Sequence, residues 1–317
     1  METTESNSLL GYGKPPWVFK GSALYQLHLV KAETARAIIP KEFKLVEAFG
    51  YTLGGFFLAN YEDSPAGVFD ELVVIAGIVW NPPTSCAWAA RVLVSSDKAC
   101  VHGREDVGLP SQVATFTKRV SAIPMTKKSR FGNFLHKIGI INDYSPGVGG
   151  YQKRSTTGNG MMIDIQVKEM MSNHTSTDIC SINLNNTPAP KWIGPAVKLP
   201  LPSFSGRTEY NPHLLKYSCQ IECRLRAVPP AKVSGPSPLA MPMHDEVVVT
   251  SEYNGSETTD FTNSNYKREL SISVMLSKPI LALEFNSLKM EKNNTISRYS
   301  EFCRESPAFQ KCLKQDK

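Results

Sequence analysis

The chain has 317 residues, of which 41% are hydrophobic and 20% charged, and its 35 basic and 29 acidic residues give a formal net charge of +6. This composition is typical of a globular protein with a sizeable core, and it excludes a largely disordered chain. The basic residues are scattered and form no long block with interleaved aromatic residues, so nucleic acid is not an expected partner.

The seven cysteines occupy irregular positions and form no Cys-x-x-Cys pair. This spacing favours buried, reduced thiols over a zinc site or a disulfide framework, and we expect neither a metal nor a cofactor.

The N-terminal stretch "METTESNSLLGYGKPPW" contains two glutamates and no arginine, whereas transit peptides are typically rich in arginine and poor in acids. The longest apolar stretch, Leu72 to Trp80, is about half of the roughly 20 residues that a membrane helix needs. We therefore expect a cytoplasmic protein without a transmembrane segment, with a plastid location as the alternative. The sequence leaves oligomerisation open.

Most of the chain alternates apolar and polar residues as strands do. A helix is expected at "AETARAIIP", which ends at Pro40 because proline lacks the backbone N–H that a helix needs. The pair Gly54-Gly55 predicts a bulge or a close backbone approach. The expected strands are residues 23–30, 51–61, 69–80, 87–96, 113–120, 161–170, 178–184, 216–228, 245–250 and 269–277.

A short helix is predicted between the fourth and fifth of these strands. Ser95 or Ser96 is a credible N-cap for "DKACVHGRE", and the helix should end near Gly108. Pro110 follows, so Ser111 and Gln112 should stand at the entrance of the next strand.

Two loops and a tail complete the pattern. Residues 121–160 hold turn signals, and residues 185–212 form a proline-rich loop of a length that usually marks a lid or a wall of a site. We expect a flexible N-terminus over 1–12, one continuous domain over 13–285, and a polar C-terminal tail or peripheral helix over 286–317. The number of strands favours a closed or sandwiched antiparallel architecture with peripheral helices.

The stretch "GREDVGLPSQ", preceded by "ARVLVSSDKACVH", resembles the signature of the acetoacetate decarboxylase family, which reads Gly-Arg-Glu, four residues, then Pro-Lys-Lys. Upstream, "KPPWVFKGSALYQLHLV", "IIPKEFKLVE" and "FDELVVIAGIV" follow the family's order, so the resemblance covers about Gly13 to Val120. It implies a β-rich α+β fold, a closed antiparallel β-barrel with peripheral helices. Within this superfamily, the run from "GYGKPPW" to "GREDVGLPSQVATF" is most similar to a plant branch associated with formation of neoxanthin, a xanthophyll.

The resemblance implies a lysine that forms a Schiff base with the ketone of a β-keto acid. Such an amine attacks only when neutral, so its pKa must lie far below the usual value near ~10.4. Ser111 and Gln112 stand at the two lysine positions, and neither forms an imine. Lys118 would share a strand face with Gln112, which leaves a small opening for a relocated amine. Lys127 and Lys128 adjoin a proline turn and are expected to be solvated. We therefore expect a cavity without an amine and no decarboxylase activity.

Other positions of the resemblance follow one at a time. Glu71 matches a family acid; it is either an acid–base group or hydrogen-bond acceptor, or an exposed residue at a strand start. Ser22 stands where the family has an arginine that holds the substrate carboxylate. Gly55 or Phe56 stands where the family has a second glutamate, so both charged groups are absent from this chain. These losses predict a more apolar pocket.

The matched turn should be structural. Arg104 and Glu105 are expected to form an ion pair that fixes it, while Gly103 and Gly108 supply special backbone angles and Pro110 stiffens the chain.

Two functions remain open. The first is an accessory protein that binds an apolar molecule, a xanthophyll or a precursor. The second is a non-decarboxylating isomerase or hydrolase with Glu71 as the general acid or base, since neoxanthin formation from violaxanthin is formally an isomerisation by epoxide opening. The expected pocket-lining residues are Ser22, Glu71, Arg104, Ser111 and Gln112.

Overall fold

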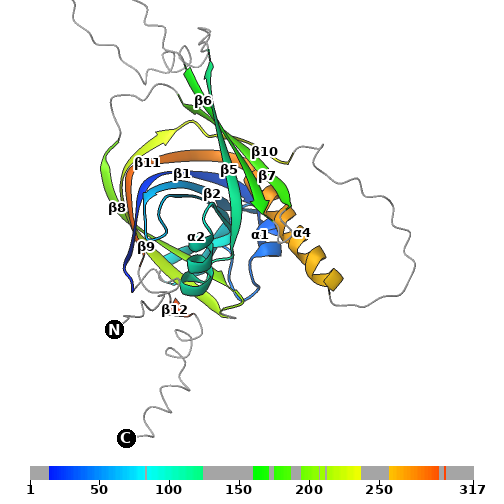
Figure 1. Cartoon of the computed structure of the whole chain (residues 1–317). Coiled ribbons are helices and arrows are strands. Elements are labelled where there is room, and N and C mark those ends of the chain that lie inside the picture. Colours follow the sequence, from blue (N-terminus) through cyan, green and yellow to red (C-terminus); the bar gives the residue numbers. More distant parts are fainter. Residues whose placement is uncertain are drawn as a thin grey trace, which may run out of the picture.

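The structure is a computed structural model that describes residues 14–82, 84–123, 160–170, 175–186, 194–206, 208–210, 213–236, 257–292 and 296–297. These residues form a 12-stranded sheet with helices packed on it. The sheet closes on itself in one part and projects as an open wing in the other (Figure 1).

The closed part is a barrel with strand order β4-β3-β2-β1-β11-β9-β8 and back to β4. All these pairs are antiparallel except the closing pair, in which β8 runs parallel to β4 at Ser203 and Phe204. The expected closed, strand-rich barrel is therefore confirmed. Its strands are β1 (Trp17–Lys31), β2 (Tyr51–Asp63), β3 (Phe69–Asn81), β4 (Thr84–Val94), β8 (Ala196–Gly206), β9 (Leu214–Val228) and β11 (Lys278–Lys292).

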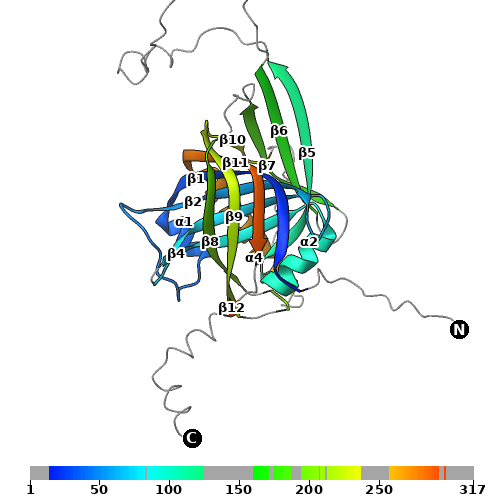
Figure 2. The same ribbon diagram turned by 90° about the vertical axis from the view of Figure 1, so that its left-hand side faces the viewer.

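The wing begins where β5 (Ser111–Ile123) pairs in parallel with the last residues of β4 and then leaves the barrel (Figure 2). It continues through β6 (Gly160–Met170), β7 (Ser176–Asn186) and β10 (Lys232–Ser234), and the short β12 (Ile296–Ser297) pairs with β9.

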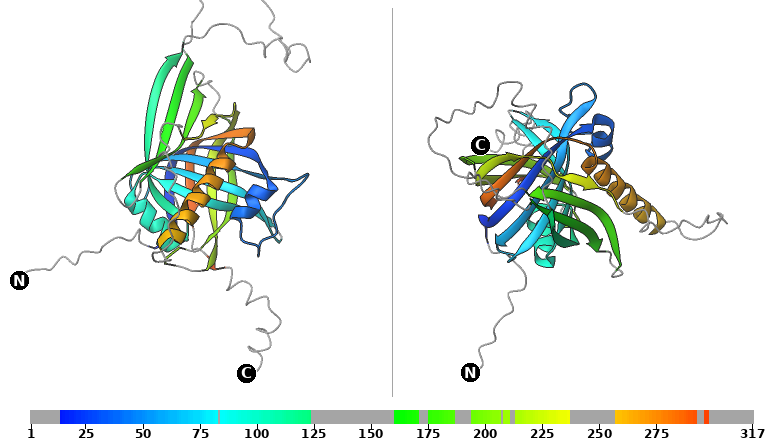
Figure 3. Two further views of the ribbon diagram at one scale, coloured as in Figure 1. Left: turned by 90° about the vertical axis from the view of Figure 1, so that its right-hand side faces the viewer. Right: turned by 90° about the horizontal axis from the view of Figure 1, so that it is seen from above.

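Helices α1 (Ala32–Ile38) and α4 (Glu257–Met275) pack on the outer face of β1, β2 and β3 (Figure 3). Helix α2 (Asp97–His102) and the π-helical turn η1 (Gly103–Val107) connect β4 to β5. Ser96 caps α2 by accepting a hydrogen bond from Ala99 N, which confirms the expected helix start. Among the described helices, none is long and apolar enough to cross a membrane.

Strand alternation gives the barrel two separate cores. Leu24, Phe56 and Val74 face outward under α1 and α4, whereas Phe57, Tyr61 and other inner residues fill the barrel. Because fully burying one such side chain contributes about 1.5–3 kcal/mol, two filled faces hold these strands in a single register.

Two expectations fail where local patterns mislead. Residues 269–277 were expected as a strand, but 269–275 end helix α4. The buried residues Ser271, Val274 and Met275 have the spacing of one helix face, which favours a helix over a strand in this segment. The proline-rich loop contains strand β8, whose prolines are tolerated because β4 reaches β8 only at Ser203 and Phe204. The expected strand 245–250 lies outside the described residues.

The boundary at 285 falls inside a strand rather than at the end of the barrel. Strand β11 continues to Lys292. A bulge with Ser287 at φ 51° interrupts the alternation, after which Leu288, Met290 and Lys292 are all buried. The polar residues between these three made the segment resemble a tail.

Candidate functional site in the barrel cavity

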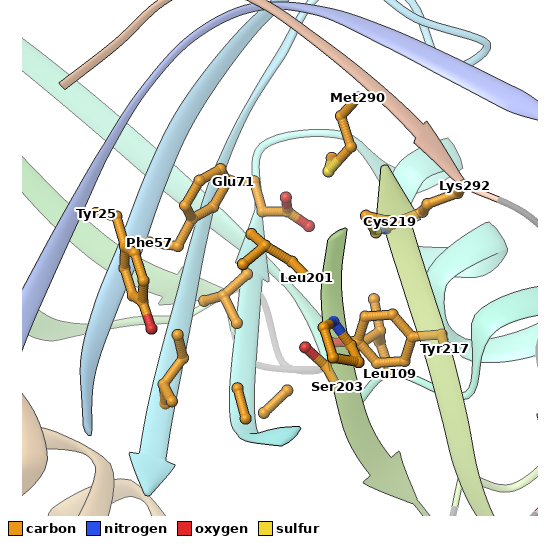
Figure 4. Close-up of a pocket in the computed structure, with 15 residues that line it drawn as sticks. Tyr25, Phe57, Glu71, Leu109, Leu201, Ser203, Tyr217, Cys219, Met290 and Lys292 are labelled. Atoms are coloured by element: carbon orange, nitrogen blue, oxygen red, sulfur yellow. The ribbon is translucent and has the colours of Figure 1, made fainter. Parts of the chain in front are cut away.

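A cavity of about 80 Å³ lies inside the barrel (Figure 4). Apolar side chains from β2, β3 and β4 make one wall. Residues Leu201 to Ser203 of β8 make another, so part of the proline-rich segment does form a wall of the cavity. Polar atoms come from a small set of residues: Tyr25, Glu71, Ser203, Tyr217, Cys219 and Lys292.

Glu71 faces this cavity from the start of β3. Alternation along β3 turns Glu71, Val73 and Ile75 inward, and all three line the cavity. The Glu71 carboxylate accepts a hydrogen bond of 2.8 Å from the hydroxyl of the fully buried Tyr61. Burial, and then the adjacent Glu71 carboxylate, raises the pKa of Tyr61 well above its usual value, so the phenol is a permanent donor. Glu71 is only 6% exposed, which excludes the solvated strand-start alternative.

Lys292 brings an amine to the same cavity. It is 8% exposed and pairs in register with Trp17 of β1 and Cys219 of β9, so its side chain shares their inner face. Its Nζ lies 5.3 Å from the centre of the Phe19 ring and 5.9 Å from that of Tyr217, within cation–π range. Among the described residues Lys292 forms no ion pair.

The expectation of a cavity without an amine is therefore wrong. Figure 4 shows the side chains of Glu71 and Lys292 directed toward the same space, from opposite parts of the barrel wall. The signal in the sequence is the alternation Leu288, Met290, Lys292, which belongs to a strand and not to a tail.

The other polar groups of the cavity are neutral donors at physiological pH. Burial raises the pKa of Tyr25 to about 12 and that of Tyr217 further still. Burial also raises the pKa of Cys219 to about 11, with Glu71 raising it and Lys292 lowering it. The cavity thus has apolar walls, several neutral hydrogen-bond donors, and a carboxyl group and an amine that are directed toward the same space.

Ser111 and Gln112 lie beside the cavity and not among the residues that line it. Ser111 is 2% exposed and packs on Gly103, while Leu109, two residues earlier, does contact the cavity. The buried Oε1 of Gln112 has no hydrogen-bond partner among the described residues.

The turn before Ser111 differs in two details from the expectation. Arg104 forms its ion pair with Glu209 and not with Glu105, which is exposed, because neighbouring residues on a helical turn point in different directions. Gly108 is left-handed at φ 71°, as expected. Gly103 has an ordinary helical φ of −57°. Glycine is needed at this position because a Cβ there would lie 2.3 Å from Ser111 Oγ.

The remaining candidates do not reach the cavity. Ser22 is exposed beside a bulge in β1, and Arg104 and Pro110 are half-buried in the turn. Lys118 is exposed and bonded to Asp70 at 2.5 Å, so it is not the relocated amine. Lys127 and Lys128 lie outside the described residues. Within the described part of the chain, no cluster of three metal-ligating side chains is found.

Several solved structures resemble this chain at low identity. An acetoacetate decarboxylase from Legionella pneumophila is 11% identical, covers 93% of this chain and 92% of its own, and has a TM-score of 0.47. An acetoacetate decarboxylase-like enzyme from Sphingomonas wittichii RW1 is 9% identical, covers 93% and 98%, and has a TM-score of 0.46. No family model matches the chain.

Curated relatives are far more similar. The protein NEOXANTHIN-DEFICIENT 1 of Solanum lycopersicum is 59% identical over 295 residues, which are 92% of this chain and 95% of the relative. The proteins of the same name from Arabidopsis thaliana and Oryza sativa subsp. japonica are 55% and 52% identical, and cover 92% and 90% of this chain and 96% and 90% of their own. At this identity and coverage, the chain belongs to the NEOXANTHIN-DEFICIENT 1 family of plant proteins.

Proposed function

We propose that this protein supports formation of the xanthophyll neoxanthin by holding an apolar ligand in the barrel cavity, without decarboxylase chemistry at positions 111 and 112. The link to neoxanthin is supported by the name of the relatives, NEOXANTHIN-DEFICIENT 1. The observation that carries the mode of action is a cavity with apolar walls and a polar end formed by Glu71 and Lys292.

The size of the cavity limits what it holds. At about 80 Å³ it is far below the ~300–1,000 Å³ of usual small-molecule sites. A xanthophyll is a long polyene with an oxygenated ring at each end, so only a ring end enters. The ring then packs on the apolar wall, and its hydroxyl or epoxide oxygen accepts a hydrogen bond from the donors at the polar end.

Pigment binding tests this proposal. Purified protein incubated with violaxanthin or neoxanthin and passed through a size-exclusion column should carry the pigment's absorption in the protein peak. Val73→Trp, which fills the cavity from β3, should remove the pigment. As a matched control, Val68→Trp changes an exposed residue between β2 and β3 and should leave pigment binding unchanged. Absence of pigment from the wild-type peak would refute the proposal.

A second candidate function is catalysis in the same cavity. Glu71, bonded to Tyr61 and buried, is placed to give or take a proton at a ligand oxygen, and Lys292 supplies a second group. Epoxide opening to neoxanthin needs one proton delivered to the epoxide oxygen and one removed from carbon, with no net change in atoms. One carboxyl group performs both steps in turn.

Product analysis separates the two functions. Conversion of violaxanthin by the wild type that is lost in Glu71→Gln, with pigment binding retained, supports catalysis; binding with no product from any variant supports the accessory function. Borohydride reduction with a small ketone gives a third readout. A covalent adduct at Lys292 would restore Schiff-base chemistry to this protein at a new position and refute the non-covalent mechanism.

A further inference from the structure

Exposed apolar residues gather at one end of the barrel, where β2 begins and β3 ends. The loop before β2 and the β3–β4 turn project together from this end in two views (Figures 2 and 3). We call this surface the barrel mouth. It consists of Val46, Phe49, Tyr51, Leu53, Trp80 and Leu281, which are between 39% and 101% exposed.

The barrel mouth continues the inner face that forms the cavity. Tyr25 pairs with Phe57 and both line the cavity; further along the same strands, Leu29 pairs with Leu53 and Lys31 with Tyr51. On the other side of β1, Leu27 pairs with Leu281. Residues paired in register share a face, so the strand face that forms the cavity wall continues onto the exposed surface.

Trp80 joins the barrel mouth from β3. Ile78 pairs with Ala87, which lines the cavity, and Trp80 follows two residues later on the same face. An apolar inner face that leaves the barrel and meets solvent is unusual, because such surfaces are normally filled by side chains from the opposite wall.

The backbone of the mouth is fixed. Trp80 N donates to Lys44 O at 2.8 Å, and Val46 N donates to Ile78 O at 2.8 Å. Ala48 and Tyr51 exchange backbone hydrogen bonds around a turn that holds Phe49 at φ 52° with its side chain 101% exposed. A bulky residue rarely adopts this backbone region, and the described fold provides no packing that compensates for it.

The chemistry of the barrel mouth matches a lipid interface. Tryptophan and tyrosine are the residues enriched where hydrocarbon meets headgroups, and Phe49 projects beyond them. The loop before β2 also carries exposed Lys41, Glu42 and Lys44, in which the two basic side chains outnumber the acid and favour anionic headgroups. The nearby acid Glu47 is already paired with Arg36.

We propose that the barrel mouth docks on the surface of a lipid bilayer, with Phe49 and Trp80 inserted at the interface and the inner face of the barrel open toward the lipid. A bilayer fits better than a protein partner because the docked surface continues the apolar strand face that lines the cavity. This inference does not depend on the ligand of the cavity.

Vesicle sedimentation tests it. The full chain is mixed with vesicles of phosphatidylcholine, or of phosphatidylcholine with phosphatidylglycerol, and the bound fraction is measured against lipid concentration. The wild type should sediment with both, and more strongly with the anionic mixture. Phe49→Glu and Trp80→Glu should each lower the partition coefficient by roughly tenfold or more, since each removes a large aromatic side chain from the apolar phase.

The matched control is Val68→Glu. Val68 is 72% exposed in the turn between β2 and β3, at the other end of the same strands, and its substitution should leave binding unchanged. Circular dichroism should show all three variants folded, because the substituted side chains are exposed. Wild-type protein that stays in the supernatant, or an equal loss in Val68→Glu, would refute docking. So would a dimer in solution that Trp80→Glu converts to a monomer, because a second copy would then cover the barrel mouth. No xanthophyll is present in this assay, so its failure leaves the proposed function untouched.

Discussion

The two ends of the barrel's inner face invert the distribution of side chains expected of a globular protein. At one end, Glu71 and Lys292 are buried; at the other, Phe49, Leu53 and Trp80 face solvent. Both kinds of residue lie on the inner face of the same strands. Burying a polar group costs folding free energy unless it is hydrogen-bonded or paired, and a gathered set of exposed apolar residues marks an interaction surface. Buried polar and exposed apolar groups are the informative departures from the usual pattern, and here they mark a polar floor and an apolar entrance.

The largest effect should come from the turn before Ser111, whose Leu109 lines the cavity. Gly103→Ala places a Cβ 2.3 Å from Ser111 Oγ and 3.2 Å from Ser111 Cβ in a buried site. We expect the free energy of unfolding to fall by about 1–3 kcal/mol, as overpacking typically does. Ser111→Gly in the same chain should restore most of the loss, which urea titration measures. An additive double variant would show that the two residues do not compete for this space.

The next effect concerns the floor itself. Glu71→Leu leaves the buried Tyr61 hydroxyl without its acceptor, so we expect a loss of about 1–3 kcal/mol. Glu71→Gln keeps an acceptor oxygen and should cost under about 1 kcal/mol, which makes it the matched control. Equal losses in both variants would mean that the charge of Glu71, and not its hydrogen bond, stabilises the floor.

Lys292→Met should behave in the opposite way. Lys292 is buried and forms no ion pair among the described residues, and methionine has a similar shape without the charge. Replacing a buried charge with an apolar side chain is often neutral or stabilising, so we expect a change between zero and a gain of about 1 kcal/mol. Pigment binding should nevertheless weaken. A marked loss of stability would instead identify Lys292 as a structural residue held by the Phe19 and Tyr217 rings.

The two ends of the inner face also show which features of the structure can be predicted from the sequence. Strand periodicity and the Gly-Pro turn at 108–110 predict most of the barrel, because apolar alternation and turn chemistry are local signals. Glu71 was identified because it matches an acid of the acetoacetate decarboxylase family at the entry of an apolar strand. Lys292 was missed because the bulge at Ser287 shifts the alternation, and because its burial depends on pairing with β1, more than 250 residues earlier in the chain. The barrel mouth was missed for a related reason, since the exposure of Leu53 and Trp80 depends on where the opposite wall ends.

The smallest expected effect, at the barrel mouth, has opposite signs for stability and function. Phe49 sits at φ 52° with no burial to lose, so Phe49→Gly removes backbone strain and should raise the free energy of unfolding by up to about 1 kcal/mol. Phe49→Ala, which keeps the strain, should leave stability within about 0.5 kcal/mol. Both variants should lose membrane partition equally, because both lack the ring. A gain in stability that coincides with lost docking would indicate that the strained turn is retained for the contact it makes outside the chain. If Phe49→Ala is instead clearly destabilising, the ring contributes to the folded state and the case for docking through Phe49 fails.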